Sequence, residues 1–226
     1  MTKKIIYISL SVIILPLIGF YARTKYCTSE KTNFSRRHVK GVLHEDNIKN
    51  GDIIFQTSLS GQSKAIQLAT HSPYSHCGII YKNGQNYFVY EAVQPVKLTP
   101  LTKWIARGKD GHYVIKRLKN VDEVLTTLVI RRMKQTGDTF KGKNYDSYFE
   151  WTDDKIYCSE LVWKIYKRAT GLEIGKLQAL RDFDLTNSAV KQKMKERYGD
   201  NIPLDEKVIS PASIYNSELL IEIHSN

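Results

Sequence analysis

The sequence predicts an α+β fold in which a small antiparallel sheet packs against helices. Short apolar runs of strand length are concentrated between residues 51 and 118, and an Asn-Gly pair joins two of them. Helical periodicity prevails from residue 121 onward. Strands and helices that are grouped in separate stretches, rather than alternating along the chain, are typical of this fold class.

Turn residues bound the strand-like runs. Gly51-Asp52 forms a turn that leads into a buried strand. Asn83-Gly84 separates two further runs, and Asn-Gly is the strongest short hairpin signal because a type I′ turn needs positive φ at both central residues. The expected strands are 53–55, 75–81, 87–93 and 113–118.

Helix ends are marked by glycine and by capping residues. Gly137 and Gly171 each follow a helical run and are expected to end it. Ser210 is expected to cap a helix that has Pro211 at its first position. The expected helices cover 63–71, 121–135, 156–170 and 186–198, with the short one after Ser210.

Composition and charge exclude several classes of protein. A chain of 226 residues with 42% hydrophobic and 11% aromatic residues is globular and long enough for one medium domain plus an appendage. Three cysteines, an odd number, do not form a disulfide framework. The net charge of +11 is spread along the chain without a nucleic-acid recognition motif. We interpret it as a basic solvated surface that favours anionic envelope components, and we expect no nucleic-acid partner.

The N-terminus has the features of an export signal. Lys3 and Lys4 precede Ile5–Tyr21, about seventeen residues without a charge. This length is at the short limit for a bilayer span, which needs ~17–25 residues. We expect residues 1–22 to be a signal peptide or membrane anchor. The uncleaved anchor is preferred because Phe20 makes a poor cleavage site after Ala22. A buried core helix is the remaining alternative.

The rest of the chain divides at a change in composition. Residues 23–46 are polar and basic, with little periodicity, and we interpret them as a tether. Residues 47–226 carry the strand and helix signals and form the expected folded domain, in which the candidate site residues described next lie. The expected location is therefore the periplasm or the outer face of a bacterial inner membrane, with residues 5–21 as the anchor.

A predicted hairpin places a histidine beside a glutamate. With Asn83 and Gly84 at the two central turn positions, His76 lies opposite Glu91. Cross-strand partners have Cβ atoms about 5 Å apart on one face, so the carboxylate can hold one imidazole nitrogen. Cys77 points to the other face, because side chains alternate along a strand, and we expect it to be a small buried filler.

No metal site is expected. His71, His76 and Cys77 match no zinc spacing, and no second ligand pair follows them. We also expect no cofactor.

A cysteine stands at the start of a predicted helix. Cys158 precedes an apolar helical stripe by one turn, and Asp153 or Asp154 is expected to cap the helix. The unpaired N–H groups and the dipole at a helix start favour the thiolate, as does a nearby imidazolium. The same N–H groups can stabilise a developing oxyanion. An inert buried cysteine is the alternative for this segment.

Five segments resemble a known family. Taken together they are similar to the circularly permuted papain-like hydrolases of the YiiX/YaeF-like branch, which are related to NlpC-type cell-wall peptidases. In this branch the histidine precedes the cysteine along the chain. The resemblance runs from about residue 49 to about residue 217 and rests on 51–55, 63–70, 74–76, 91–93 and 157–163.

The resemblance implies a set of roles and an activity. It implies Cys158 as nucleophile, His76 as base and Glu91 as the polar residue that orients the histidine, in an amidase or peptidase that passes through a thioester. Peptide or peptidoglycan-type substrates are expected, and the substrate-binding residues are left unassigned. Two alternatives stay open: an acyl hydrolase or transferase for lipid or ester substrates, and a membrane-tethered binding module without catalysis.

Overall fold

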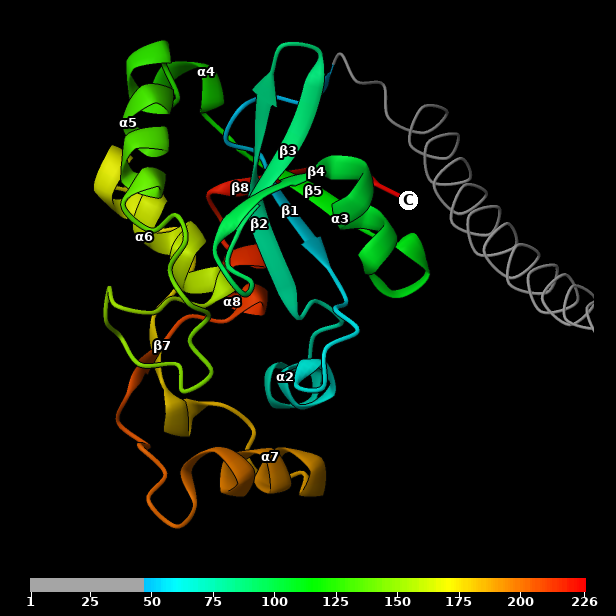
Figure 1. The fold of residues 1–226 in the computed structure, drawn as a ribbon, viewed down its shortest axis with the longest axis vertical. Coiled ribbons are helices and arrows are strands. Elements are labelled where there is room, and N and C mark those ends of the chain that lie inside the picture. The colour runs from blue at the N-terminus through cyan, green and yellow to red at the C-terminus, as the bar shows by residue number, and fades with distance from the viewer. Residues whose placement is uncertain (1–46) are drawn as a thin grey trace, which may run out of the picture. The chain divides into compact units, whose positions relative to one another are not determined.

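A six-stranded antiparallel sheet forms the centre of the fold in the computed structural model, which describes residues 47–226 (Figure 1). Its spatial order is β4-β3-β2-β1-β5-β8, so that β1 and β2 are central. The first three strands along the chain are therefore neighbours. The strands are β1 (Ile53–Gln56), β2 (His76–Asn83), β3 (Asn86–Glu91), β4 (Lys97–Pro100), β5 (Val114–Leu118) and β8 (Leu220–Ser225).

Helices account for most of the remaining regular structure. They are α2 (Ser63–Thr70), α3 (Leu101–Arg107), α4 (Val121–Val124), α5 (Thr127–Asp138), α6 (Cys158–Thr170), α7 (Ser188–Tyr198) and α8 (Pro211–Tyr215). Two 3-10 turns, η2 (Lys109–Gly111) and η3 (Leu180–Asp182), and a small two-stranded ladder, β6 (Gln178–Ala179) with β7 (Lys207–Val208), complete the set. The α+β class predicted from the sequence is confirmed.

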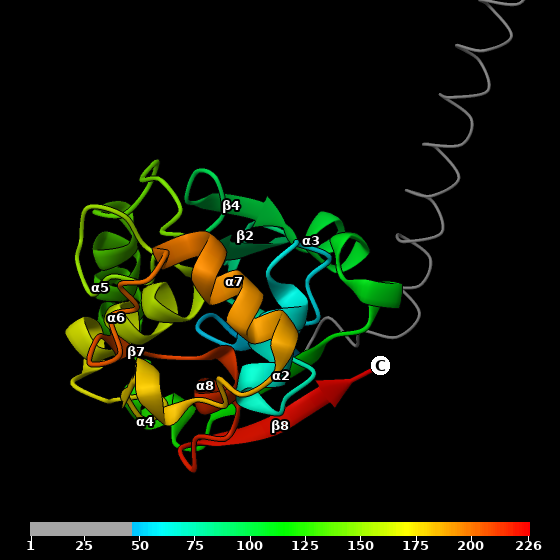
Figure 2. The same cartoon turned by 90° about the horizontal axis from the view of Figure 1, so that it is seen from below.

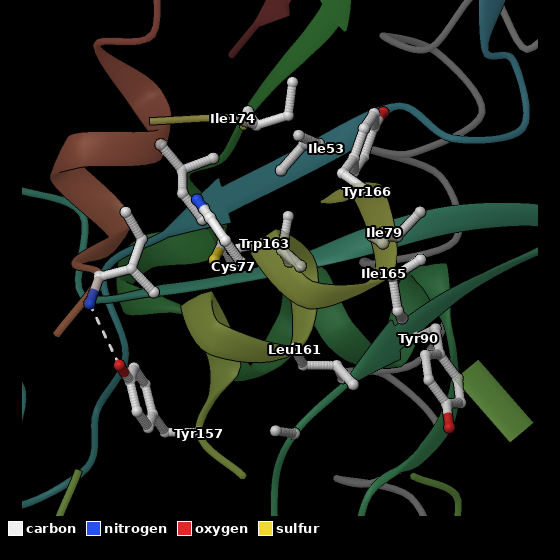
Figure 3. Packing of buried hydrophobic residues seen from close by; sticks show 14 of the residues in the cluster. Ile53, Cys77, Ile79, Tyr90, Tyr157, Leu161, Trp163, Ile165, Tyr166 and Ile174 are labelled. Carbon is white, nitrogen blue, oxygen red and sulfur yellow. Dashed lines mark hydrogen bonds between the residues drawn. The ribbon is translucent and has the colours of Figure 1, made fainter. Parts of the chain in front are cut away.

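The sheet is covered on both faces. α5 and α6 lie on one side of it, and α3 lies on the other side near β3 and β4 (Figure 1). The core on the α6 side includes Cys77, Ile79 and Tyr166, all buried (Figure 3). Because side chains alternate along β2, His76 faces away from this core, toward α3.

α2 and α7 pack against each other beyond the end of the central strands (Figures 1 and 2). His71 ends α2 in the left-handed conformation, with φ 50°, and Asn187 caps α7 by accepting from the Ala189 N–H. These two helices come from segments more than one hundred residues apart along the chain. Together they form a wall of the cavity described below.

The long helix predicted over 121–135 is wrong. The structure has two helices, α4 and α5, because Thr126 begins a new one by accepting a hydrogen bond from the Val129 N–H. Gly137 lies inside α5 and does not end it. A Cβ at Gly137 would lie 3.1 Å from the Tyr90 ring, and the Tyr90 hydroxyl donates to the Gly137 carbonyl at 2.6 Å. Glycine is therefore needed here for close packing against β3.

The predicted segments 1–22 and 23–46 lie outside the described residues. Across 47–226, no helix has both the length and the apolar composition that a membrane span requires. The anchor and the tether stay predictions.

Candidate active site

The β2–β3 hairpin brings His76 and Glu91 together, although in a different register from the predicted one. Asn83 pairs with Asn86, so the two turn residues are Gly84 and Gln85 rather than Asn83 and Gly84. Gly84 has φ 60°, as the first central residue of a type II′ turn requires. His76 and Glu91 are thus diagonal neighbours instead of direct partners.

The contact between His76 and Glu91 forms in spite of the error in the predicted register, because both side chains stay on the same face of the hairpin. Moving the turn by one residue displaces each cross-strand partner by two, and side chains two residues apart lie on the same side of a strand. Continuing the observed register places Gly78 opposite Glu91, and a Cβ there would lie 3.4 Å from the Glu91 Cβ. The missing side chain leaves room for Glu91 to reach the His76 Nε2, 2.7 Å from its Oε2.

Glu91 is a fully buried carboxylate that accepts four hydrogen bonds. Besides the His76 ring, Trp104 and Arg107 of α3 donate to its Oε2 at 2.8 and 2.5 Å, and Thr99 of β4 donates to its Oε1 at 2.6 Å. Burial opposes the charge, but the bonds from His76 and the charges of His76 and Arg107 lower the pKa of Glu91 to about 2. The carboxylate is ionised and fixed in place.

Trp104 also orients the histidine ring from the side. Its indole stacks on the imidazole, with ring centroids 5.8 Å apart and an interplanar angle of 24°. With Nε2 held by Glu91, the Nδ1 atom of His76 is the ring nitrogen left for a reaction partner. Sequence reasoning missed Trp104, Thr99 and Arg107, because the docking of α3 and β4 leaves no short-range signal in the sequence.

Cys158 is the first residue of α6. The predicted cap at Asp153 or Asp154 is wrong; the cap is Tyr157, whose backbone N–H donates to Glu160 Oε2 at 3.4 Å. Asp153 instead pairs with Lys164 and Arg168. The helix starts two residues later than predicted, which places the thiol directly at the free N–H groups.

The start of α6 is tied to the segment before α8. The Ile209 N–H donates to the Tyr157 hydroxyl at 3.1 Å, marked by the dashed line in Figure 3. The Ser159 hydroxyl donates to the Ile209 carbonyl at 2.7 Å. The two residues that flank Cys158 are therefore both hydrogen-bonded to the backbone of Ile209, which holds the thiol in position.

The charges at the site favour a thiolate–imidazolium pair. A hydrogen bond with the Cys77 thiol favours the thiolate, burial opposes it, and the charge and hydrogen bond of His76 favour it again, so that the pKa of Cys158 lies well below its ordinary value. Burial opposes the charge on His76, but the Cys158 thiolate and Glu91 raise the pKa of the imidazole to about 9. The structure thus brings together Cys158, His76 and Glu91, the three residues singled out from the sequence.

Cys77 is fully buried, as expected for a filler, and it also contacts the nucleophile candidate. Its thiol lies on the α6 side of β2, and its pKa is raised by burial and by the adjacent Cys158. A protonated thiol at this position can donate to the Cys158 thiolate. The alternation of side chains along the strand places His76 and Cys77 on opposite faces, yet both reach Cys158 because the thiol lies at the end of the strand.

A chain of polar side chains joins Arg197 of α7 to Tyr145 through Gln62, which precedes α2, and sequence reasoning did not find it. The Gln62 side-chain amide donates to the Tyr145 hydroxyl oxygen at 2.8 Å, and Arg197 donates to Gln62 Oε1 at 2.8 Å. Burial, and after it the charge of Cys158, raise the pKa of the Tyr145 hydroxyl, and Tyr145 and Cys158 line the same cavity. Because its oxygen already accepts a bond from Gln62, the Tyr145 proton is free to be donated.

Three comparisons agree on the relatives of this chain. The sequence profile described as "Permuted papain-like amidase enzyme, YaeF/YiiX, C92 family" matches residues 47–224. YiiX of Escherichia coli K12 is 48% identical over 175 residues, which are 77% of this chain and 85% of YiiX. The crystal structure of a protein described as metalloprotein yiiX, from Escherichia coli O157:H7, superposes with a TM-score of 0.75 at 48% identity, covering 79% of this chain and 97% of that one.

Proposed function

Because this chain belongs to the permuted papain-like amidase family, we propose that it hydrolyses an amide bond through a thioester on Cys158. The observation that carries the proposal is the placement of Cys158 at a helix start beside His76, which Glu91 orients. A cysteine hydrolase needs a thiolate, a proton donor for the leaving amine and donors for the oxyanion, and side chains or backbone groups suited to each are present.

The proposed reaction proceeds in two stages. The Cys158 thiolate attacks the amide carbonyl carbon, and the oxyanion accepts hydrogen bonds from backbone N–H groups at the start of α6 and from the Tyr145 hydroxyl. The C–N bond then breaks as the His76 imidazolium gives its proton to the leaving nitrogen. Neutral His76 takes a proton from water, the hydroxide attacks the thioester, and the acid leaves Cys158 as thiolate.

No step of the proposal uses a metal ion, although the related protein from Escherichia coli O157:H7 is described as a metalloprotein. Within residues 47–226, no group of three or more His, Cys, Asp or Glu side chains is arranged to hold a metal ion. The His76 Nε2 is engaged by Glu91, and both Glu91 oxygens already accept hydrogen bonds. The side chains at the candidate site do not fit a metal centre.

The test compares an amide and an ester that carry the same acyl group. We expect the wild-type protein to hydrolyse the amide and Cys158→Ala to have no activity on it, measured as release of the free amine. If the wild-type protein hydrolyses the ester but cleaves the amide no faster than the uncatalysed reaction does, the amidase proposal is wrong. The protein is then an acyl-ester hydrolase. An apolar cavity at Cys158, described below, is the observation that favours this second candidate.

The pH dependence of the amide reaction follows from the raised pKa of His76. The imidazolium is present below about 9 and is lost above it, so the proton for the leaving amine is lost as pH rises through this value. We expect kcat/KM to be level through neutral pH and to fall above about pH 9. A kcat/KM that rises steadily to pH 10 or beyond, as for an ordinary thiol of pKa ~8.5, would contradict the ion-pair mechanism.

We also propose that the protein acts outside the cytoplasm, held by residues 5–21 at the outer face of the membrane. The support is the charged start and the apolar run in the sequence. Full-length protein should then stay in the membrane fraction after carbonate washing. A soluble form that begins near Arg23 would show cleavage instead.

A further inference from the structure

Two cavities of opposite character meet at the candidate site. The first adjoins Cys158, has a volume of about 80 Å³ and is lined mostly by apolar side chains. Its walls are α2, α7, the start of α6 and the segment that leads into α8. Representative lining residues are Ala65, Ile66, Ala69, Phe149, Val190 and Met194.

The second cavity adjoins His76 and is polar. It is wider, at about 730 Å³, and its lining includes serine hydroxyls, Gln94 and Arg107. Cys158 lines only the first cavity and His76 only the second, whereas Gln62, Tyr145, Lys193 and Arg197 line both. The chain of hydrogen bonds from Arg197 to Tyr145 therefore marks the boundary between them.

The proposed chemistry assigns one half of the substrate to each cavity. The acyl group stays on the sulfur as the thioester, so it occupies the cavity at Cys158. The amine leaves with a proton from His76, so it departs through the cavity at His76. An apolar acyl group and a polar amine fit this division.

Arg197 is the residue that gives the polar cavity at His76 a preference for an anionic group. The other cations nearby are paired: Lys193 with Glu196 at 2.5 Å, and Arg107 with Glu91 at 2.5 Å. Arg197 forms no ion pair with any carboxylate of residues 47–226; it stacks on Phe149, 4.3 Å from the ring centroid, and donates to Gln62. A guanidinium with free N–H groups at a substrate cavity is suited to a carboxylate, which it binds in a planar fork.

We infer that the substrate is an amide between a medium-sized apolar acyl group and an amine that carries a free carboxylate, such as an α-amino acid. This inference rests on the proposed function, because the proposed reaction decides which half of the substrate lies in each cavity. The volume of the first cavity sets the acyl size: an apolar cavity of about 150 Å³ holds the six carbons of benzene, so about 80 Å³ holds about three or four carbons. The carbonyl carbon and the carbon next to it lie at the sulfur, outside this count. A six-carbon chain or a leucine-like side chain fits, and a long fatty chain does not.

The test is a binding measurement that does not depend on turnover. Calorimetric titration of the Cys158→Ala protein would use hexanoylglycine, its carboxamide hexanoylglycinamide, and acetylglycine. We expect hexanoylglycine to bind about tenfold or more tightly than its carboxamide, because a charge-assisted bond to Arg197 is lost. Acetylglycine should bind more weakly by up to about a hundredfold, because it leaves four methylene groups fewer in the cavity.

Two further substitutions in the Cys158→Ala background locate the binding determinants. Arg197→Gln should abolish the preference for carboxylate over carboxamide, and Ala65→Phe should abolish the preference for hexanoyl over acetyl. Arg181→Gln is the matched control, because Arg181 pairs with Asp205 and lines neither cavity. It should leave both preferences unchanged.

The binding measurements test the inference about the substrate, and the hydrolysis measurements test the proposed function. Equal binding of the acid and the carboxamide, or an unchanged preference in Arg197→Gln, would overturn the inference even if the wild-type protein cleaves amides. Selective binding of hexanoylglycine together with no hydrolysis of any amide by the wild-type protein would reject the proposed function instead.

Discussion

Replacing Cys158 with alanine should reduce kcat/KM for an amide substrate on the order of 10⁴-fold or more, because the bond-forming group is removed. His76→Ala should cause a loss of about 10³-fold, since it removes both the proton donor and the charge that stabilises the thiolate. Initial rates of amine release measure both. The stability cost should be small for Cys158→Ala, about 1 kcal/mol, because only one sulfur atom is lost.

Matched controls separate these losses from general damage. Cys77→Ala removes the other described free thiol, and with it a hydrogen bond to the Cys158 thiolate but not the nucleophile, so it should cost far less activity than Cys158→Ala. His71→Ala removes a histidine whose side chain is 75% exposed and is paired with Asp184. Activity within about tenfold of wild type in Cys158→Ala would exclude the cysteine as nucleophile.

Glu91→Ala should lose both activity and stability. The carboxylate has no exposed side-chain surface, and its removal leaves the Trp104 indole N–H and the Thr99 hydroxyl, both buried, without their acceptor. We expect the free energy of unfolding to fall by about 3 kcal/mol, measured by urea denaturation. The sequence predicts Glu91 as the residue that orients His76; its role in joining β3, β4 and α3 comes only from the structure.

Glu91→Gln distinguishes charge from hydrogen bonding. A glutamine offers one acceptor oxygen for donors that two carboxylate oxygens now serve, so the stability loss should be smaller than with alanine but measurable. The missing charge lowers the pKa of His76 from about 9, so the alkaline fall in kcat/KM should move to lower pH. Glu222→Gln, at an exposed position in β8, is the control. An unshifted pH profile in Glu91→Gln would remove Glu91 from the catalytic set.

The sequence predicts the contact between His76 and Glu91 correctly even though it places the hairpin turn one residue too early. Strand periodicity is two, so a turn misplaced by one residue leaves both side chains on the same face. The position of Cys158 is predicted for a similar reason, since an apolar stripe fixes the helix face even when the start is wrong by two residues. The periodicity of strands and helices is therefore enough to predict the main residues of the site.

The remainder of the site depends on contacts that have no period. Trp104 and Arg107 reach Glu91 only because α3 packs over β3 and β4, and Tyr145 lies in a segment with no regular structure. Arg197 and Gln62 are joined across 135 positions of the chain. Local patterns along the sequence carry no information about such pairings, which arise from tertiary packing.

Covalent trapping tests the central claim most directly. The wild-type protein is mixed with an amide substrate, quenched in acid during turnover, and its intact mass and peptide masses are measured. The thiolate mechanism predicts an added mass equal to the acyl group, located on the peptide that contains Cys158 and removed by hydroxylamine. Amide hydrolysis at an undiminished rate by Cys158→Ala, with no acyl adduct in the wild-type protein, would contradict it.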